Sequence, residues 1–334
     1  KALGVRYIES ALRNRGYEVT TVFLKDFNSV NPKPATDKEI AILTDVIRKT
    51  NPLFVGLSVM SSMYLDTVHA VIGAVKSTGY PMVCGGAYAT MFPEHFLARG
   101  VDYVIRADGE NPICALADAI MLGKNADHIP SLCYKKNDEI IINDIDGILT
   151  EIDGYGLPQI NCPNAYKIEN NTLSFGDPQL STLSYEVIAS RGCPFTCSYC
   201  CSINLNRLFP KGKKYVRTRS VENIIDELII AKNTHKKLVF IHFYDEIFPN
   251  SLDWVDKFVE EYKKHINLPF TIWGHPKMIK RDVIAKLKTV GLVEVIMGIQ
   301  SGSPYIRSEI FHRYETQEDI INATKILAEE GIFW

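Results

Sequence analysis

The chain has 334 residues, of which 46% are apolar and 23% charged, and its formal net charge is −2. This length exceeds one average domain and suits two. The balanced charge attracts no polyanion in bulk, which excludes nucleic acid as a default partner. No run approaches the ~20 apolar residues of a membrane-spanning helix. Eight cysteines in a chain of this size, three of them clustered, indicate a reducing compartment, so we expect a cytoplasmic protein.

Helices and strands alternate through the first 143 residues. Thr36 and Glu39 form a capping-box pattern that starts one helix, and Pro52 must end it. The run over residues 53–59 is continuously apolar, which predicts an interior parallel strand. The other elements are predicted at 2–15 (helix), 18–24 (strand), 65–77 (helix), 81–84 (strand), 94–99 (short helix), 102–106 (strand), 111–122 (helix) and 131–143 (hairpin turning at Asn137 and Asp138). This alternation predicts a doubly wound, Rossmann-like α/β domain over residues 1–143, whose first strand lies upstream because Lys1 opens the chain inside a helix-like pattern.

Small and polar residues follow three strands of this predicted domain. Ligands of doubly wound sheets bind beyond the carboxyl ends of the strands. Glycine there permits close backbone approach, and serine offers a hydroxyl group. Any α/β domain has small residues at strand ends, so ligand binding and a purely structural role both stay open on the residues alone. The candidate binding residues are Ser58, Met60, Ser61, Ser62, Gly85, Gly86, Ala87, Gly109 and Glu110.

The second half of the chain predicts a different α/β architecture. Residues 144–182 contain several Pro, Asn and Gly residues with no sustained period, which predicts a linker. From residue 183 onward, β–α units repeat, and such units close into a barrel with its chemistry at the carboxyl ends of the strands. Four units are complete, and residues 331–334 have the pattern of a fifth strand cut short, so the barrel over 183–334 is incomplete. The predicted strands are 184–190, 238–244, 270–274 and 293–299, and the predicted helices are 220–233, 252–264, 279–289 and 316–330.

A CxxxCxxC array directly follows the first strand of this second region. Its cysteines are Cys193, Cys197 and Cys200. Three thiolates on one short loop can face one small volume, and in a four-iron four-sulfur cluster they leave one iron open to a further ligand. The alternatives are a zinc loop and a disulfide framework, but structural zinc takes four ligands and no second cysteine pair follows. We expect the adjacent Cys201 to point away from the cluster, because neighbouring residues project differently.

The array resembles the cluster loop of the radical S-adenosylmethionine (SAM) enzymes, with Tyr199 at the aromatic place of their CxxxCx(aromatic)C motif. Two further segments of that family recur downstream in order. The segment 244–248, YDEIF, resembles the family's DDxF, and the segment 298–303, GIQSGS, resembles its GIESGS. The resemblance implies that Asp245 and Glu246 hold the methionyl ammonium of SAM. It also implies that the segment 298–303 lies near the ribose and the carboxylate of SAM. The SAM-binding residues implied are Tyr199, Asp245, Glu246, Gln300 and Ser301, while His275, Lys277 and Arg313 stay open candidates for cofactor or substrate contacts.

The first domain resembles the cobalamin-binding domain that precedes the radical domain in one branch of this family. The resembling segments read VGLSV, GGAYAT and VDYVIRADGE, in that order. The family's usual GEGE form is replaced here by the ADGE of the last segment. The Asp-x-His-x-x-Gly loop of other cobalamin proteins does not occur in this sequence. The resemblance therefore implies cobalamin with its base detached and Met60 or a neighbour near its lower face, although Met60 as core filler stays an open interpretation.

The resemblance implies chemistry at both domains. SAM would chelate the open iron, and an electron from the reduced cluster would cleave it to a 5′-deoxyadenosyl radical. A methyl carrier in front of a radical generator predicts methylation of an unactivated carbon or phosphorus. Two other interpretations stay open: a radical cyclase or oxidoreductase in which cobalamin carries electrons, and a non-catalytic metal-binding sensor or scaffold. We expect an electron donor such as flavodoxin or ferredoxin, and a small-molecule, lipid or peptide substrate.

Overall fold

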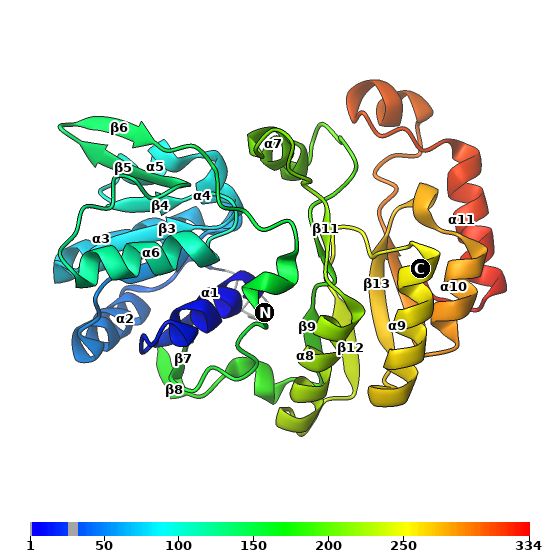
Figure 1. Ribbon diagram of the computed structural model, residues 1–334, viewed down its shortest axis with the longest axis horizontal. Coiled ribbons are helices and arrows are strands. Elements are labelled where there is room, and N and C mark those ends of the chain that lie inside the picture. Colours follow the sequence, from blue (N-terminus) through cyan, green and yellow to red (C-terminus); the bar gives the residue numbers. More distant parts are fainter. Residues whose placement is uncertain (1, 26–32) are drawn as a thin grey trace. The chain divides into compact units, whose positions relative to one another are not determined.

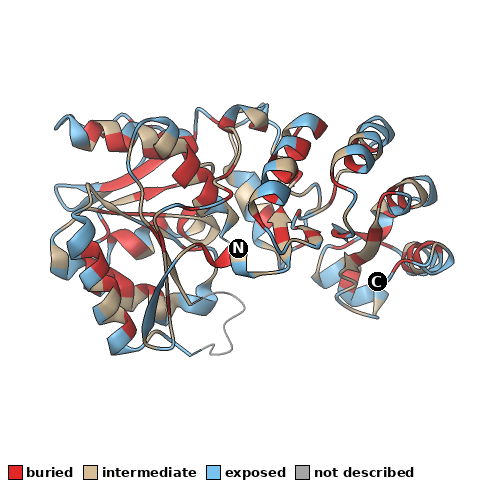
Figure 2. Cartoon of the chain, turned by 90° about the horizontal axis from the view of Figure 1, so that it is seen from below, coloured by how far each residue is buried: buried red, intermediate tan, exposed pale blue. Residues whose placement is uncertain are grey.

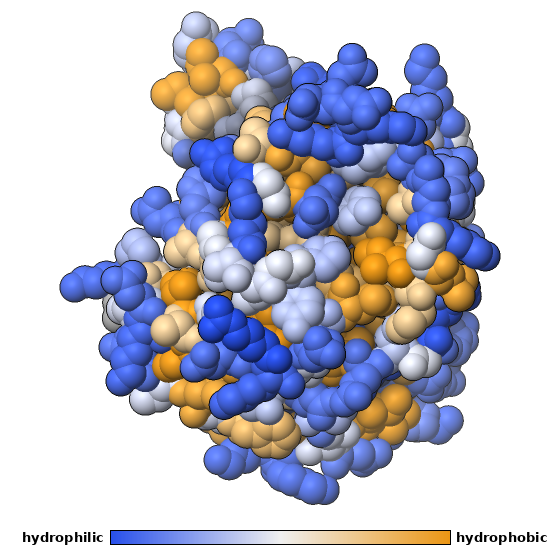
Figure 3. All heavy atoms as spheres, turned by 90° about the vertical axis from the view of Figure 1, so that its left-hand side faces the viewer, coloured by the Kyte–Doolittle hydropathy of each residue, from blue (hydrophilic) through white to orange (hydrophobic). Residues whose placement is uncertain are grey.

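The computed structural model describes residues 2–25 and 33–334 (Figure 1). The chain divides into two compact α/β units. Unit 1 comprises Lys1–Leu149, Asn161–Pro178 and Leu208–Lys211, and unit 2 comprises Thr150–Ile160, Gln179–Arg207 and Gly212–Trp334. None of the described helices is long and apolar enough to cross a membrane. The face drawn in Figure 3 is largely hydrophilic, with separate apolar patches between the polar side chains.

The main sheet of unit 1 has the strand order β2-β3-β4-β5-β6. The first three strands are parallel, and β5 and β6 are antiparallel. Asn137 and Asp138, which join β5 to β6, have φ angles of 49° and 65°, so both occupy the left-handed region that tight hairpins need. The predicted hairpin is therefore confirmed. The strands are β2 (Val55–Ser58), β3 (Met82–Gly85), β4 (Tyr103–Ile105), β5 (Leu132–Lys136) and β6 (Glu139–Ile142).

Helices cover both faces of this sheet because successive side chains of each strand point to opposite sides. Met82 and Cys84 of β3 pack in one apolar cluster with α2 (Asp37–Thr50) and α3 (Leu65–Thr78). Val83, between them, belongs to a second cluster with Leu12 and Leu116, which lie on α1 (Leu3–Asn14) and α6 (Glu110–Met121). In Figure 2 the buried residues follow the strands and one side of many of the helices. The predicted doubly wound fold is confirmed.

The linker prediction for residues 144–182 differs most from the structure. This stretch contains η2 (Ile152–Tyr155), β7 (Ala165–Glu169), β8 (Thr172–Phe175) and η3 (Pro178–Ser181). β7 pairs in parallel with β1 (Thr21–Leu24), so the predicted strand 18–24 joins this small second sheet instead of the main one. The asparagines at 170 and 171, which favoured a loop, have φ angles of 52° and 60° and form the hairpin turn between β7 and β8.

A buried ion pair holds this returning segment to unit 1. Arg6 of α1 and Asp177 have fully buried side chains, and two parallel hydrogen bonds of 2.7 Å join them. The backbone N–H of Cys162 donates a third bond to the same carboxylate at 2.9 Å. The Arg6 guanidinium also lies 5.4 Å from the ring centroid of Phe23, a residue of β1, the strand with which β7 pairs. Residues 161–178 are therefore a structural part of unit 1.

Unit 2 is built on an open parallel sheet with the order β14-β13-β12-β9. Each strand lies beside the next strand of this sheet in sequence, and a helix follows each one, as in the repeated units of a barrel. Phe333 continues the series, because it forms a parallel bridge with Glu294. No closed barrel forms in residues 2–25 and 33–334. The strands are β9 (Ser184–Val187), β12 (Phe240–Phe243), β13 (Phe270–Gly274) and β14 (Leu292–Met297), and the helices are α8 (Val221–Thr234), α9 (Leu252–His265), α10 (Arg281–Lys288) and α11 (Gln317–Glu329).

The two faces of this sheet differ in chemistry. Tyr185 of β9 and both Ile241 and Phe243 of β12 are fully buried in the apolar cluster that includes α8 and α9. The alternate residue His242 points to the other face, where its Nδ1 lies 2.8 Å from Thr271 Oγ1. One face therefore stabilises the fold, and the polar residues are left for the opposite face and the carboxyl ends of the strands.

Candidate functional site

The cluster loop, residues 192–200, begins directly after β10 (Ser190–Arg191), which pairs with β11 (Arg217–Thr218). Gly192 fixes its first turn, with a φ of 89° and its backbone so close to Tyr215 that an added Cβ would lie 2.5 Å from that residue's carbonyl oxygen. Only glycine fits such a position without displacement. The loop ends where α7 (Cys201–Leu208), a helix that the sequence did not predict, begins.

The three predicted cysteines lie close enough for the charges of Cys197 and Cys200 to act on the thiol of Cys193. Burial is the main cause that raises the pKa of Cys193 to about 11, and the nearby charges of Glu246, Cys200 and Cys197 add to it. A hydrogen bond from Cys201 lowers the pKa of Cys200 to about 6. The Cys201 side chain therefore lies beside that of Cys200, and its direction relative to the cluster stays a prediction. In unit 1, by contrast, burial in the apolar core raises the pKa of Cys84 to about 12, so its thiol stays protonated.

This donor set fits an iron–sulfur cluster better than a single ion. Within the described residues, no three His, Cys, Asp or Glu side chains are gathered closely enough to hold one metal ion. A four-iron cluster takes one thiolate on each of three irons, so its ligands surround a larger object and need not converge on a point. All three cysteines are free thiols. The loop therefore supplies the soft ligands that such a cluster requires.

The two acids after β12 have different surroundings. Asp245 is buried, and its carboxylate accepts hydrogen bonds from the backbone N–H of Ala189, at 2.9 and 3.1 Å, and from the hydroxyl of Ser190 at 2.6 Å. Burial raises the pKa of Asp245 to about 7. Its carboxylate thus anchors the start of the cluster loop, and its role at the SAM ammonium stays a prediction. Glu246 remains exposed, and its charge acts on Cys193 and Cys200.

The turn over residues 298–303 places the other SAM-binding candidates at the end of β14. Gln300 is exposed and has a φ of 69°, a strained conformation for a residue other than glycine. Ser301 accepts a hydrogen bond from the backbone N–H of Ser303 at 3.1 Å, which leaves its hydroxyl hydrogen available to a ligand. A buried arginine, Arg307, donates to the Ser301 carbonyl at 2.7 Å and fixes the turn from behind. No local sequence signal identified Arg307.

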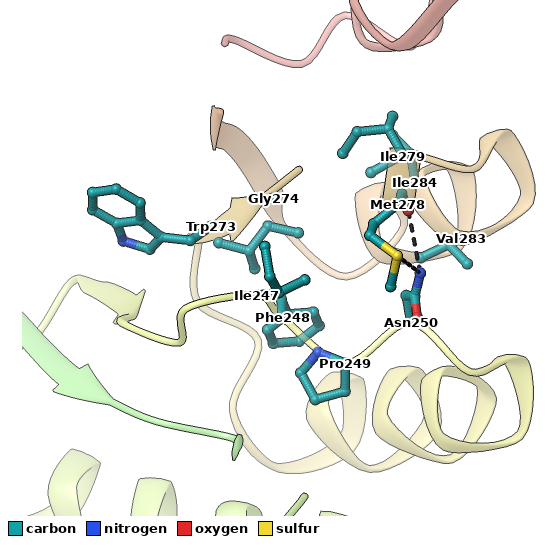
Figure 4. Close-up of a pocket in the computed structure, with 11 residues that line it drawn as sticks. Ile247, Phe248, Pro249, Asn250, Trp273, Gly274, Met278, Ile279, Val283 and Ile284 are labelled. Atoms are coloured by element: carbon teal, nitrogen blue, oxygen red, sulfur yellow. Dashed lines mark hydrogen bonds between the residues drawn. The ribbon is translucent and has the colours of Figure 1, made fainter. Parts of the chain in front are cut away.

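The three open candidates separate into two kinds. His275 and Arg313 are buried, with 2% and 8% of their surfaces exposed, so they serve the loops around them more than a ligand in the open site. Burial lowers the pKa of His275 to about 3, and it is therefore neutral. Lys277 lies on the short turn η4 (Pro276–Met278) and is exposed. A cavity beside this turn, drawn in Figure 4, has a volume of about 20 Å³ and is too small for a substrate.

In unit 1 the three predicted loops meet at one sheet edge, because β2, β3 and β4 are parallel neighbours. The bonds from Val59 N–H to the Gly85 carbonyl, at 2.8 Å, and from Tyr88 N–H to the Val59 carbonyl, at 3.1 Å, tie the first two loops together. Met60 is 66% exposed, so it is not core filler. Ser61 caps the turn η1 (Ser62–Tyr64) through Met63 N–H. The remaining candidates Ser58, Gly85, Gly86, Ala87 and Gly109 line these strand ends, whereas Glu110 is buried in the first turn of α6.

Comparison with known proteins gives matches for both units. Residues 1–117 match the B12 binding domain family, and residues 187–333 match the radical SAM superfamily. An uncharacterised methyltransferase of Pyrococcus horikoshii is 26% identical over 303 residues, which cover 89% of this chain and 62% of that protein. The anaerobic magnesium-protoporphyrin IX monomethyl ester cyclase of Cereibacter sphaeroides is 24% identical and covers 98% of this chain and 52% of that protein. The chain thus spans between half and two thirds of the length of these relatives.

Two solved structures share the fold across nearly the whole chain. The radical SAM methyltransferase TsrM of Kitasatospora setae has a TM-score of 0.74 at 17% identity, covering 99% of this chain and 63% of that one. The cobalamin-dependent SAM radical enzyme OxsB has a TM-score of 0.72 at 16% identity, covering 100% of this chain and 46% of that one. The fold and both matches define a B12-binding domain followed by a radical SAM domain. Residues 1–117 therefore belong to the B12-binding family and residues 187–333 to the radical SAM superfamily, in the order that the resemblance seen in the sequence implied.

Proposed function

We propose that this chain binds a [4Fe-4S] cluster, SAM and cobalamin, and that it methylates an unactivated carbon or phosphorus of its substrate. The observation that carries this proposal is the loop of Cys193, Cys197 and Cys200 in a chain whose B12-binding domain precedes the radical SAM domain. When bound, the cluster supplies the electron that cleaves SAM, and cobalamin supplies the methyl carrier. The residues of the chain bind, orient and shield these groups.

Each side chain at the loop has a defined task in this proposal. The thiolates of Cys193, Cys197 and Cys200 would hold the cluster, and a cluster with three protein ligands would keep one iron available to SAM. Glu246 is the acid that pairs with the SAM ammonium, because it is exposed beside the cysteines while Asp245 is occupied by backbone groups. The Gln300 amide and the Ser301 hydroxyl hydrogen-bond the ribose or carboxylate end. Tyr199 borders the same site.

Cobalamin is assigned to the strand-end loops of unit 1, at the edge where doubly wound sheets bind flat ligands. Met60 and its neighbours Ser61 and Ser62 would contact the corrin, and Gly85, Gly86 and Ala87 would allow the backbone to approach it. Glu110 contributes by starting α6 instead of by contact, since only 4% of it is exposed.

Gly86→Val is expected to abolish cobalamin binding while the cluster is retained. Gly86 has a φ of 99°, and an added Cβ would lie 2.6 Å from the Val59 carbonyl oxygen, so the two loops must separate. The measurement is anaerobic titration of the full chain with hydroxocobalamin, followed by its visible spectrum. Gly73→Val is the matched control, because Gly73 lies on α3 with no atom within 4 Å of the added Cβ. Unchanged binding by Gly86→Val would remove cobalamin from this edge.

Methylation requires two SAM molecules per product, one cleaved reductively and one donating its methyl group. The test is anaerobic turnover of the reconstituted chain with methyl-labelled SAM, a strong reductant and a panel of peptides, lipids and small metabolites. We expect 5′-deoxyadenosine and S-adenosylhomocysteine in equal amounts and label in the product. Absence of 5′-deoxyadenosine with every reductant would instead favour the non-catalytic sensor or scaffold.

A second candidate is a radical cyclase or oxidoreductase in which cobalamin carries electrons. It is favoured by the match to the Cereibacter sphaeroides cyclase, which covers 98% of this chain. The same turnover experiment separates the two. Substrate loss with 5′-deoxyadenosine but with neither S-adenosylhomocysteine nor labelled product would support cyclisation or oxidation.

Reductive cleavage needs an electron from outside the chain. We therefore propose flavodoxin or ferredoxin as the donor, in a reducing cytoplasm where free thiols persist. The substrate is proposed to be a small molecule, lipid or peptide, and nucleic acid is not expected because the formal net charge is −2.

A further inference from the structure

Arg313 lies buried where two loops of unit 2 meet. Its guanidinium donates to acceptors from three segments: Nε to Glu315 Oε1 at 2.5 Å, Nη1 to the Tyr199 phenol oxygen at 3.2 Å, and Nη2 to the Gly298 carbonyl. Tyr199 belongs to the cluster loop, and Gly298 begins the turn that carries the other SAM-binding candidates. Because a guanidinium is planar with its donors in fixed directions, one rigid group joins the two loops.

A π-helical turn, η5 (Ile306–Ile310), docks on the same loop independently of the guanidinium. The backbone N–H of Ser198 donates to the Phe311 carbonyl at 2.9 Å, and the Ser198 hydroxyl donates to the Ile310 carbonyl at 2.6 Å. The rings of Tyr199 and Phe311 meet edge-on with centroids 5.0 Å apart. Single π-turns occur frequently at functional sites. These bonds bring the segment that carries Arg313 to the cluster loop.

The orientation of the Arg313 guanidinium is set from behind by Glu315. This carboxylate is 3% exposed, and its second oxygen lies 3.3 Å from Nε2 of His275. Both atoms are buried without a hydrogen-bond partner, so they form a close contact instead of a hydrogen bond. His275 stacks on Phe195, with ring centroids 3.8 Å apart and an interplanar angle of 17°. The chain of contacts thus returns to the cluster loop on the other side of Cys197, two residues before it, while Tyr199 lies two residues after it.

We propose that Arg313 is a positioning residue for SAM, which holds the turn of Gln300 and Ser301 at a fixed place relative to the cluster loop through Tyr199 and Gly298. This inference rests on the proposed function. SAM must reach the open iron and the turn at the same time, so a loose turn weakens its binding even when the cluster is intact. A misplacement of 1 Å can cost about 100-fold in an enzymatic step, although the guanidinium itself touches neither ligand.

The test uses the full chain, reconstituted anaerobically, with Arg313→Lys and Arg313→Gln. The measurements are iron content, thermal melting, and the electron paramagnetic resonance spectrum of the reduced cluster during titration with SAM. Both variants should retain iron and the spectrum without SAM. Half-maximal perturbation by SAM should need about tenfold more SAM in Arg313→Lys, because a lysine point charge cannot join both acceptors, and more still in Arg313→Gln. Arg281→Lys is the matched control, since its exposed guanidinium pairs with Glu329 and Glu330 on the outer helices.

If Arg313→Lys needs no more SAM than the wild type for half-maximal perturbation of the spectrum, the inference is overturned, because a positive charge or packing alone would then hold the turn. Equal weakening of SAM binding in Arg281→Lys would also overturn it. If Arg313→Gln fails to fold, the lysine variant decides the matter alone. Failure of the wild-type chain to hold a cluster would contradict both the proposed function and the inference. If the wild type binds the cluster and SAM and the Arg313 variants bind SAM equally well, only the role of Arg313 is contradicted.

Discussion

Replacing Cys193, Cys197 or Cys200 by alanine is expected to remove most of the bound iron and all reductive cleavage of SAM. With only two of the three protein thiolates left, one iron of the cluster loses its protein ligand. The measurements are iron and sulfide content, the visible absorption of the reconstituted protein, and 5′-deoxyadenosine formed with an excess of reductant.

Cys201→Ala is the matched control for this experiment. Cys201 is exposed, begins α7 and hydrogen-bonds Cys200 without belonging to the CxxxCxxC spacing. The variant should retain iron and cleavage activity, because a bound iron stabilises the Cys200 thiolate far more than a thiol hydrogen bond does. Iron loss from Cys201→Ala equal to that from Cys200→Ala would overturn the ligand assignment.

Arg6→Gln is expected to destabilise unit 1 by about 3–5 kcal/mol, the usual effect of removing one partner from a buried ion pair. Asp177 would remain buried without the opposite charge of Arg6, although the backbone N–H of Cys162 still donates to its carboxylate. The chain has two units and need not unfold in one step, so the measurement is hydrogen exchange at the paired amides of β1 and β7 with increasing urea.

Two further variants decide whether the ion pair is responsible. Arg15→Gln removes an arginine just beyond the same helix, but that guanidinium is exposed beside Asp118 and the change should leave the exchange of β7 unaltered. The double variant Arg6→Met with Asp177→Leu should recover much of the loss, because both charges leave together and apolar groups fill the space. Exchange in Arg6→Gln that matches wild type would show that the pair does not hold this segment.

Local patterns in the sequence predicted the parts of the fold that depend on neighbouring residues. The capping box at Thr36 starts α2, and Asn137 and Asp138 turn the hairpin as predicted. The apolar run at 53–59 forms the parallel strand β2, but the prediction of an interior strand is wrong, because β2 ends the described sheet and its residues are alternately half-buried and exposed. The pairing of β1 with β7 could not be predicted, because it joins residues about 140 positions apart and Asn170 and Asn171 equally favour a loop or a turn.

In the candidate site, too, local patterns were predictable from the sequence and contacts between distant residues were not. The cysteine spacing identified the cluster loop without any knowledge of the fold. The difference between Asp245 and Glu246 could not be predicted, because adjacent acids in a sequence carry no sign of which one the backbone of Ala189 will occupy. The hydrogen bond between Ser198 and Ile310 could not be predicted either, because it joins residues 112 positions apart and no sequence periodicity indicates the π-turn at Ile306–Ile310.

The return of residues 161–178 to unit 1 has a consequence for how the protein is made. Thr150–Ile160 belong to unit 2, yet they are synthesised before β7 and β8, which complete unit 1. The emerging chain therefore cannot complete its first domain until the ribosome has added Asp177. Until then, Thr150–Ile160 are already synthesised but cannot pack against the rest of unit 2. For the same reason no single proteolytic cut or expression boundary yields both domains whole: a fragment ending at residue 143 lacks the strand beside β1, and one starting at 179 lacks η2.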